Sequence, residues 1–172
     1  MKHLLTTIFL LIVVVFNTKA QINYSVKIES GFVKFMNNTV QIDPGPGWQG
    51  YYLNEGQNGI DINLINGLTI FNERLFLGIG LGYQNFIGID GISVFSDIEY
   101  LPLKSRFTPL LDLKIGYDHI WNQYDGGKGT ALTELGVGAS FKLTEKLNIY
   151  LKSGLLLTQQ SSLVPVRIGI RF

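Results

Sequence analysis

Residues 164–172 read VPVRIGIRF. Apolar side chains alternate with other residues, so one face of an extended segment is wholly apolar while the other carries Arg167 and Arg171. An apolar strand at the edge of a soluble sheet is a pairing hazard. A strand that closes a membrane barrel avoids this hazard, because its edge pairs with the first strand and its apolar face meets lipid. Residues 164–172 therefore predict the closing strand of a transmembrane β-barrel.

The N-terminus has the features of a secretory signal peptide. Lys2 and His3 form a short basic region, residues 4–16 are almost all apolar, and a short polar exit ends in alanine. The alternative is a membrane anchor, but roughly 13 residues interrupted by threonines fall short of the roughly 20 that a spanning helix needs. We expect cleavage of residues 1–20 and a mature domain of 21–172. No other stretch approaches the length of a spanning helix, so further membrane insertion must use strands.

Composition limits the class of protein. The chain of 172 residues has no cysteine, which excludes disulfides, thiolate zinc sites, cysteine nucleophiles and a lipidated cysteine anchor. Without Lys2 and Lys19 of the signal peptide, 12 basic residues stand against 13 acidic ones with no basic run, so no nucleic-acid partner is expected. Charged residues make up 16%, against roughly 25% in soluble domains. A mature chain of about 152 residues corresponds to one domain.

Eight segments of the mature chain alternate with the period of a β-strand. They span approximately residues 24–33, 60–70, 75–84, 92–100, 110–121, 133–142, 149–158 and 164–172. Turn-sized breaks follow the second, fourth and sixth segments, at 71–74, 102–106 and 144–146. Looser connections follow the first, third, fifth and seventh, at 36–58, 88–91, 122–129 and 161–162. This all-β pattern predicts an eight-stranded antiparallel up-and-down transmembrane β-barrel, with tight periplasmic turns and longer outer loops.

The charges of these segments fall on one face. No Asp, Glu, Lys or Arg stands in phase with the Leu, Ile and Val set, and the strand charges in the opposite phase are Lys27, Glu29, Asp61, Asp97, Glu99, Asp112, Lys114, Asp118, Glu134, Lys142, Lys152, Arg167 and Arg171. A basic residue on the lipid face costs about 2–4 kcal/mol at mid-membrane, so selection for insertion explains this segregation. A soluble sandwich or lipocalin-like barrel would also separate its faces. Glycines in the polar phase and aromatic residues at strand ends favour the membrane barrel.

The polar phase is expected to fill the barrel interior, because eight strands enclose a space just wide enough for side chains. This phase carries six basic and seven acidic residues. We therefore expect a polar lumen that neutralises its own charges and forms no pore. Because unpaired buried charges are costly, we expect carboxylate partners for Lys114, Lys152, Arg167 and Arg171.

The middle of the chain resembles a known family. The runs ISVFSDIEY at 92–100, LKSRFTP at 103–109 and LDLKIGY at 111–117 are similar to the middle of the outer-membrane β-barrel proteins abundant in Bacteroidetes, small relatives in architecture of OmpX and the OmpA transmembrane domain. The closing strand ending in Phe172 is similar to the signature that the barrel assembly machinery recognises. The resemblance implies this fold and an outer-membrane location. A barrel in that membrane is expected to contact outer-membrane lipid and lipopolysaccharide. It implies no substrate.

His119 is the one histidine of the expected mature chain and the strongest candidate for catalysis. Lipid A deacylases of the outer membrane use a nucleophilic serine two residues after a histidine, and that position here is Trp121. A histidine base without a nearby serine has nothing to activate. We therefore place His119 in an interfacial aromatic belt between Tyr117 and Trp121.

The other polar patterns have structural interpretations. Asp97, Glu99 and Asp112 could act as acid and base, but they share the inward face with basic residues, so ion pairing is favoured. The glycine run at 78–82 precedes no helix, which argues against a nucleotide site. Asp125 alone is a poor Ca²⁺ site, because Ca²⁺ takes six to eight oxygens.

No catalytic, cofactor-binding or metal-binding residue is therefore expected. The first hypothesis is a monomeric, non-enzymatic outer-membrane barrel with a filled polar lumen and a role in envelope integrity or surface interaction. The alternatives are a lipid A-modifying enzyme and a small-solute pore.

Overall fold

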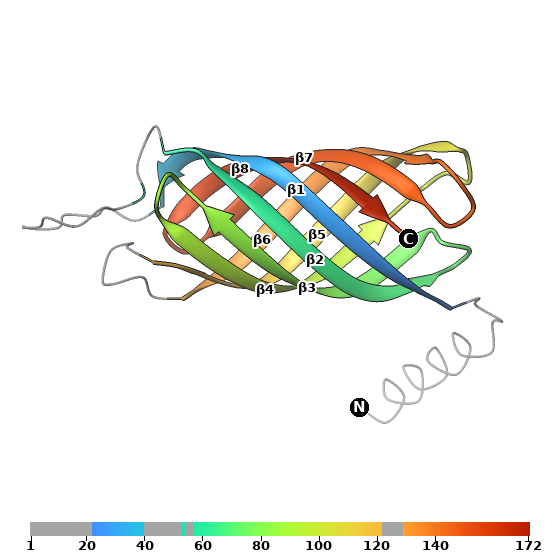
Figure 1. The fold of residues 1–172 in the computed structure, drawn as a ribbon, viewed down its shortest axis with the longest axis horizontal. Coiled ribbons are helices and arrows are strands. Elements are labelled where there is room, and N and C mark those ends of the chain that lie inside the picture. The colour runs from blue at the N-terminus through green and yellow to red at the C-terminus, as the bar shows by residue number, and fades with distance from the viewer. Residues whose placement is uncertain (1–21, 40–52, 54–56, 122–128) are drawn as a thin grey trace, which may run out of the picture.

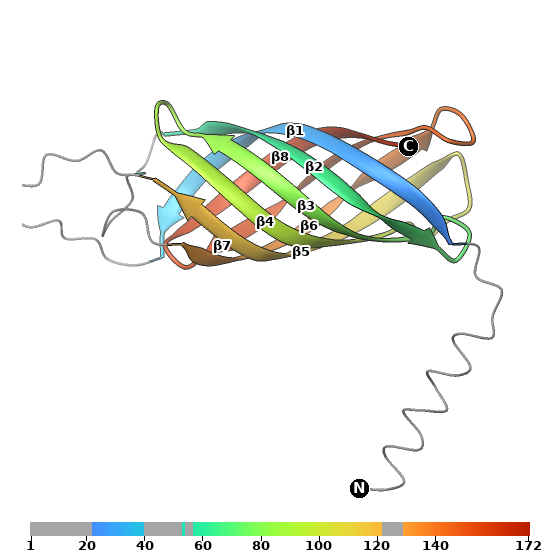
Figure 2. The same ribbon diagram turned by 60° about the horizontal axis from the view of Figure 1, so that its bottom comes forward.

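The computed structural model describes residues 22–39, 53, 57–121 and 129–172. These residues form eight strands: β1 (Asn23–Asn38), β2 (Gly59–Ile70), β3 (Leu75–Asn85), β4 (Asp90–Tyr100), β5 (Phe107–Ile120), β6 (Thr130–Lys142), β7 (Asn148–Thr158) and β8 (Ser161–Arg171). The strands make one closed antiparallel barrel in chain order, and β8 pairs with β1 (Figures 1 and 2). The predicted eight-stranded up-and-down barrel is confirmed. Within the described residues, no helix has the length and hydropathy needed to cross a membrane.

The closing strand takes the predicted place. In β8, Ile168 lies opposite Ser30 of β1 on one side and Leu151 of β7 on the other. The side chain of Ile168 is 64% exposed, whereas that of its neighbour Arg167 is 3% exposed. Alternate residues of a strand point to opposite faces, so the apolar set of 164–172 faces outward and the arginines face the lumen.

Two predicted connections are wrong in position. Ser161 and Ser162 do not connect β7 to β8, because they belong to β8 and pair with Asn38 and Asn37 of β1. The connection between β3 and β4 lies at residues 86–89 instead of 88–91. Ladder hydrogen bonds come from the backbone, so polar residues can extend a strand beyond the apolar alternation that reveals it in the sequence.

The first strand also runs further than predicted. β1 continues to Asn38, with a register shift between Phe35 and Asn37, so the long connection begins later than residue 36. The extension places Lys34 on the outward face near the loop end, which is an exception to the predicted charge-free face. Most of the predicted loop at 36–58 lies outside the described residues, as do the signal peptide and Asp125.

The outer surface of the barrel is mainly apolar. Aliphatic side chains such as Ile79, Leu135 and Ile168 are more than 60% exposed on the outward face. The aromatic residues predicted at strand ends are exposed there as well: Tyr83, Tyr100, Tyr117 and Trp121. An apolar belt with aromatic residues at its borders is the surface expected of a barrel that spans a bilayer.

The lumen is only partly polar, which corrects the predicted polar filling. Its inward face includes one large cluster of buried apolar side chains: Val33, Phe35, Leu53, Ile65, Phe76, Phe86, Ile89, Phe95, Ile120, Leu132, Leu156 and Leu163. Most of these residues lie in the loop-side half of their strands or in the connections at that end. These large apolar residues share the inward phase with the charged residues from which the polar lumen was predicted.

Candidate functional site

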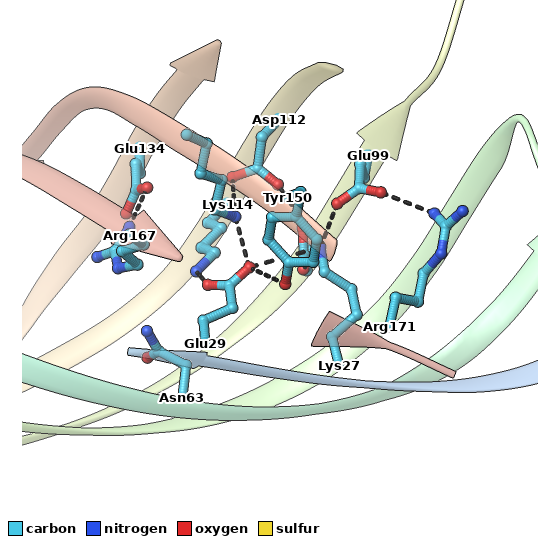
Figure 3. Close-up of polar contacts among 12 residues, drawn as sticks. Lys27, Glu29, Asn63, Glu99, Asp112, Lys114, Glu134, Tyr150, Arg167 and Arg171 are labelled. Atoms are coloured by element: carbon cyan, nitrogen blue, oxygen red, sulfur yellow. Dashed lines mark hydrogen bonds and ion pairs between the residues drawn. The ribbon is translucent and has the colours of Figure 1, made fainter. Parts of the chain in front are cut away.

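Charged side chains from several strands meet inside the barrel (Figure 3). They form a group of four cations and four carboxylates, which we call the central network: Lys27, Glu29, Asp97, Glu99, Asp112, Lys114, Lys152 and Arg171. Each has 4% or less of its surface exposed. The network comes from β1, β4, β5, β7 and β8, whose alternation turns these residues inward while their apolar neighbours face outward.

Lys27 joins the turn-side half of the network. Its Nζ lies 2.8 Å from Oδ2 of Asp97 and 2.6 Å from Oε2 of Glu99. The other carboxylate oxygen of Glu99 accepts a hydrogen bond of 2.7 Å from Nη1 of Arg171. Glu99 therefore links β4 to both strands of the closing pair, β1 and β8 (Figure 3).

Glu29 joins the other half of the network. Its carboxylate lies 2.6 Å from Nζ of Lys114 and 2.6 Å from Nζ of Lys152. The hydroxyl of Tyr150 donates a third bond of 2.9 Å to Glu29. Lys152 also lies 2.8 Å from Asp112. Buried ion pairs stabilise a fold only when geometry and hydrogen bonding are good, and three donors on one carboxylate meet that condition.

Glycines leave the room that these long side chains occupy. A Cβ on Gly169 would lie 2.3 Å from the ring of Tyr150, and one on Gly138 would lie 2.7 Å from Cβ of Lys152. Real Cβ atoms do not approach side chains this closely, so a larger residue would displace Tyr150 or Lys152. This agrees with the interpretation of the inward glycines as space for a crowded interior.

A second group of charges lies on the loop side of the central network. Arg167 donates to Asp61 at 2.6 Å and also contacts Glu134. Asp118 accepts only a long bond, 3.4 Å, from Nε2 of Gln84, and its other oxygen has no partner within the described part of the chain. We call Asp61, Asp118, Glu134 and Arg167 the loop-side group.

The two groups differ in charge balance. The central network is neutral, with four cations and four carboxylates, whereas the loop-side group has three carboxylates for Arg167 alone. Within the described residues, the loop-side group therefore departs from the predicted self-neutralising lumen. The predicted set of six inward basic residues included Lys142. In the structure Lys142 lies half-exposed at the barrel end and pairs with Glu73 of a turn at 3.0 Å. The predicted carboxylate partners are confirmed for four inward cations: Lys114, Lys152, Arg167 and Arg171.

The structure separates His119 from the candidate carboxylates Asp97, Glu99 and Asp112, which lie together in the central network. His119 lies in the outward phase of β5, and its ring meets that of Trp121 edge to face at 4.9 Å, as expected of a residue in the aromatic belt. Asp97, Glu99 and Asp112 bind lysines in the central network, so the pairing interpretation is confirmed.

The glycines of β3 lie against side chains of the neighbouring strands and leave no space there for a ligand. A Cβ on Gly82 would lie 2.3 Å from the hydroxyl of Ser93, and one on Gly80 would lie 2.5 Å from Phe95. No three His, Cys, Asp or Glu side chains among the described residues are grouped as metal ligands. Tyr150 was not predicted as part of the network, although its position in the inward phase, two residues before Lys152, indicated that it faces the lumen.

The chain is similar in structure to several solved outer-membrane barrels. Neisserial surface protein A has a TM-score of 0.65 at 11% identity, over 87% of this chain and 97% of that chain. The N-terminal β-barrel domain of OprF from Pseudomonas aeruginosa has a TM-score of 0.56 at 13% identity, over 88% of this chain and 100% of that chain. The outer membrane enzyme PagL has a TM-score of 0.49 at 12% identity, over 86% of this chain and 98% of that chain.

No protein-family model matches the sequence, and no curated protein matches it. The resemblance to barrels of Bacteroidetes therefore stays a prediction. At identities of 11–13% the structural similarity identifies the fold alone. The fold is that of the eight-stranded outer-membrane β-barrels.

Proposed function

We propose that the protein is a non-conducting outer-membrane barrel with a role in envelope integrity or surface interaction. The observation that carries this proposal is the filled lumen. The central network crosses the barrel from β1 to β4, β5 and β7, and each of its lysines lies within 2.8 Å of at least one carboxylate. A solute passing through would have to separate these ion pairs, and breaking one buried pair costs about 3–5 kcal/mol.

The apolar cluster on the loop side supports the same proposal. Leu53 belongs to the connection between β1 and β2, and it is buried with Phe86, Ile89 and Leu163 at that end of the barrel. Ions and polar solutes are poorly accommodated among such side chains, since an unpaired charge in an apolar environment is strongly disfavoured. The lumen thus has two successive barriers of different chemistry.

Membrane insertion is supported by the outer surface. The outward face carries exposed aliphatic residues along every strand, while the charged strand residues Lys34 and Asp90 lie near the loop end. In an outer-membrane barrel the short turns face the periplasm and the longer loops face outward. In this orientation residues 71–74 and 101–106 would face the periplasm, and residues 86–89 between β3 and β4 would face the cell surface.

The proposed partners follow from this location. The outward face would contact outer-membrane lipid and, in the outer leaflet, lipopolysaccharide. The barrel assembly machinery would engage the closing segment that ends in Phe172 during insertion. A monomer is proposed because the barrel closes on itself and leaves no strand edge for pairing with another chain.

The proposal includes no catalytic step and no pore. His119 contacts Trp121, and the candidate acid–base carboxylates are bound to lysines. A lipid A-modifying activity would need a nucleophile beside His119. The alternative functions therefore lack a supporting side-chain arrangement in the described part of the chain.

Fractionation of cells that produce the full chain tests the proposal. We expect the protein in the outer-membrane fraction, starting at Gln21 by mass spectrometry, with different gel mobility before and after heating. Heat-dependent mobility indicates a folded barrel that resists detergent until it is heated. Recovery of a folded protein from the soluble periplasm would contradict the proposal.

A further inference from the structure

A pocket with a volume of about 290 Å³ opens at the turn-side end of the barrel. It lies between the turn after β2, the connection between β4 and β5, and the ends of β6, β7 and β8. The pocket is distinct from the loop-side apolar cluster and lies next to the central network, because Arg171 belongs to both the network and the pocket wall.

The pocket wall is strongly basic. Five cations line it against one carboxylate, that of Glu73: Arg74, Lys104, Arg106, Lys142 and Arg171. Two of these cations have carboxylate partners, since Lys142 pairs with Glu73 and Arg171 pairs with Glu99. The remaining three have no carboxylate partner among the described residues, so the pocket has an excess of positive charge.

The two unpaired guanidinium groups are held in place by neutral groups. Arg74 donates through Nε to the carbonyl of Leu101 at 3.1 Å and through Nη2 to the hydroxyl of Tyr100 at 2.8 Å. Arg106 donates through Nε to the carbonyl of Lys142 at 3.1 Å and lies over the ring of Phe141. Carbonyl and hydroxyl oxygens fix these side chains without neutralising their charge, and each arginine keeps terminal N–H donors.

The buried part of the pocket wall adds neutral donors. Ser140 and Asn148 line the pocket and are at most 8% exposed, whereas the hydroxyl of Thr108 already donates to the carbonyl of Pro109. Arg171 binds Glu99 through Nη1, as Figure 3 shows, so part of its guanidinium group is not used in that bond. The N–H groups of guanidinium side chains and a hydroxyl group around one concave space can donate hydrogen bonds to the oxygens of a phosphate group.

We propose that this turn-side pocket binds a phosphate group through Arg74, Lys104 and Arg106. The source favoured by the surroundings is the headgroup of an anionic phospholipid, because apolar Phe71, Leu103 and Leu143 are exposed on the same turns. Apolar residues beside cations suit the border between hydrocarbon and headgroups. The lipid source rests on the proposed membrane location, whereas the phosphate chemistry rests on the pocket alone.

Two binding measurements on the detergent-refolded mature chain separate these sources. Calorimetry with inorganic phosphate, against chloride at equal ionic strength, measures the pocket without a membrane. Native mass spectrometry from mixed micelles measures retention of phosphatidylglycerol relative to phosphatidylcholine. Lys104→Gln is the main variant, since Lys104 is exposed and makes no ion pair with the described residues. The double variant with Arg106→Gln removes a second charge, and Lys34→Gln at the opposite end is the matched control.

The proposal predicts saturable binding that falls by about tenfold or more in the double variant, by less in Lys104→Gln, and not at all in Lys34→Gln. Binding of inorganic phosphate alone would identify a free anion as the ligand, and selective retention of phosphatidylglycerol would identify the lipid. Absence of both, or an equal loss in Lys34→Gln, would overturn the proposal. The heat-dependent gel shift shows that each variant has refolded. Because the binding measurements are made in detergent, a lack of binding would overturn the phosphate site without affecting the fractionation test of the proposed function.

Discussion

Lys27 of β1 and Arg171 of β8 lie directly opposite each other where the barrel closes, and both bind the same carboxylate, Glu99 of β4. The two contacts are 2.6 Å and 2.7 Å long and use different oxygens of Glu99. Two adjacent cations would repel each other in a buried lumen. Glu99 therefore stabilises the closing pair of strands from the far side of the barrel.

Replacing Glu99 by Gln should destabilise the barrel strongly. The substitution keeps the shape but leaves Arg171 without its carboxylate and Lys27 with fewer, and loss of one partner of a buried pair costs about 3–5 kcal/mol. Urea unfolding in lipid vesicles measures the change. Glu145→Gln, on the exposed turn after β6, is the control and should change the unfolding free energy by less than about 0.5 kcal/mol. Equal stability of both variants would show that the network contributes little.

Asp118→Asn should act in the opposite direction. Asp118 is 1% exposed, and the part of the chain that the structure describes offers it a bond from Gln84 but no cation. Removing an uncompensated buried charge should raise the unfolding free energy by about 1–3 kcal/mol. Asp112→Asn on the same strand removes a partner of Lys152 and should lower it. Urea unfolding at neutral pH that gives both variants the same sign would contradict the assigned charge balance.

Ile168→Arg should reduce the amount of assembled barrel. Ile168 lies on the outward face of the closing strand, and an arginine at mid-membrane on that face costs about 2–4 kcal/mol. Tyr24→Arg, near the turn-side end of β1, is the depth control and should cost at most about 1 kcal/mol. The heat-dependent gel shift of membrane fractions measures assembly. Normal assembly of Ile168→Arg would mean that this face does not meet lipid.

His119→Ala should leave the lipid A profile of the cell unchanged. The ring of His119 contacts Trp121 at the border of the barrel, so its loss removes a local aromatic contact only. Mass spectrometry of extracted lipid A from cells with either form of the protein is the measurement. A change in acylation that depends on His119 would restore the enzyme hypothesis.

The sequence predicted the barrel well because strand alternation in a bilayer is constrained at every position. A single phase of apolar residues runs through each segment, and the structure keeps that phase in all eight strands. The strand ends were less predictable. Ser161, Ser162 and Asn38 extend the ladder through backbone hydrogen bonds, which leave no pattern in side-chain polarity.

The sequence predicted that the interior contains ion pairs, but it did not predict which residues pair with each other. Ion pairing of Lys114 and Lys152 follows from the cost of isolated buried charge, so the sequence sufficed. Which carboxylate pairs with which cation depends on strand tilt and register across the lumen. Glu29, for example, meets Lys114 although 85 residues separate them. The same geometry places Lys142 outside the lumen and leaves Asp118 without a cation among the residues that the structure describes.

Single-channel recording tests the closed lumen most directly. Purified, folded protein is added to planar bilayers under an applied voltage, with heat-unfolded protein as the control. The filled lumen predicts no stable conductance steps for the wild type, because the central network and the apolar cluster both obstruct the axis. Reproducible steps that require the folded monomer would contradict a non-conducting barrel and favour a small-solute pore.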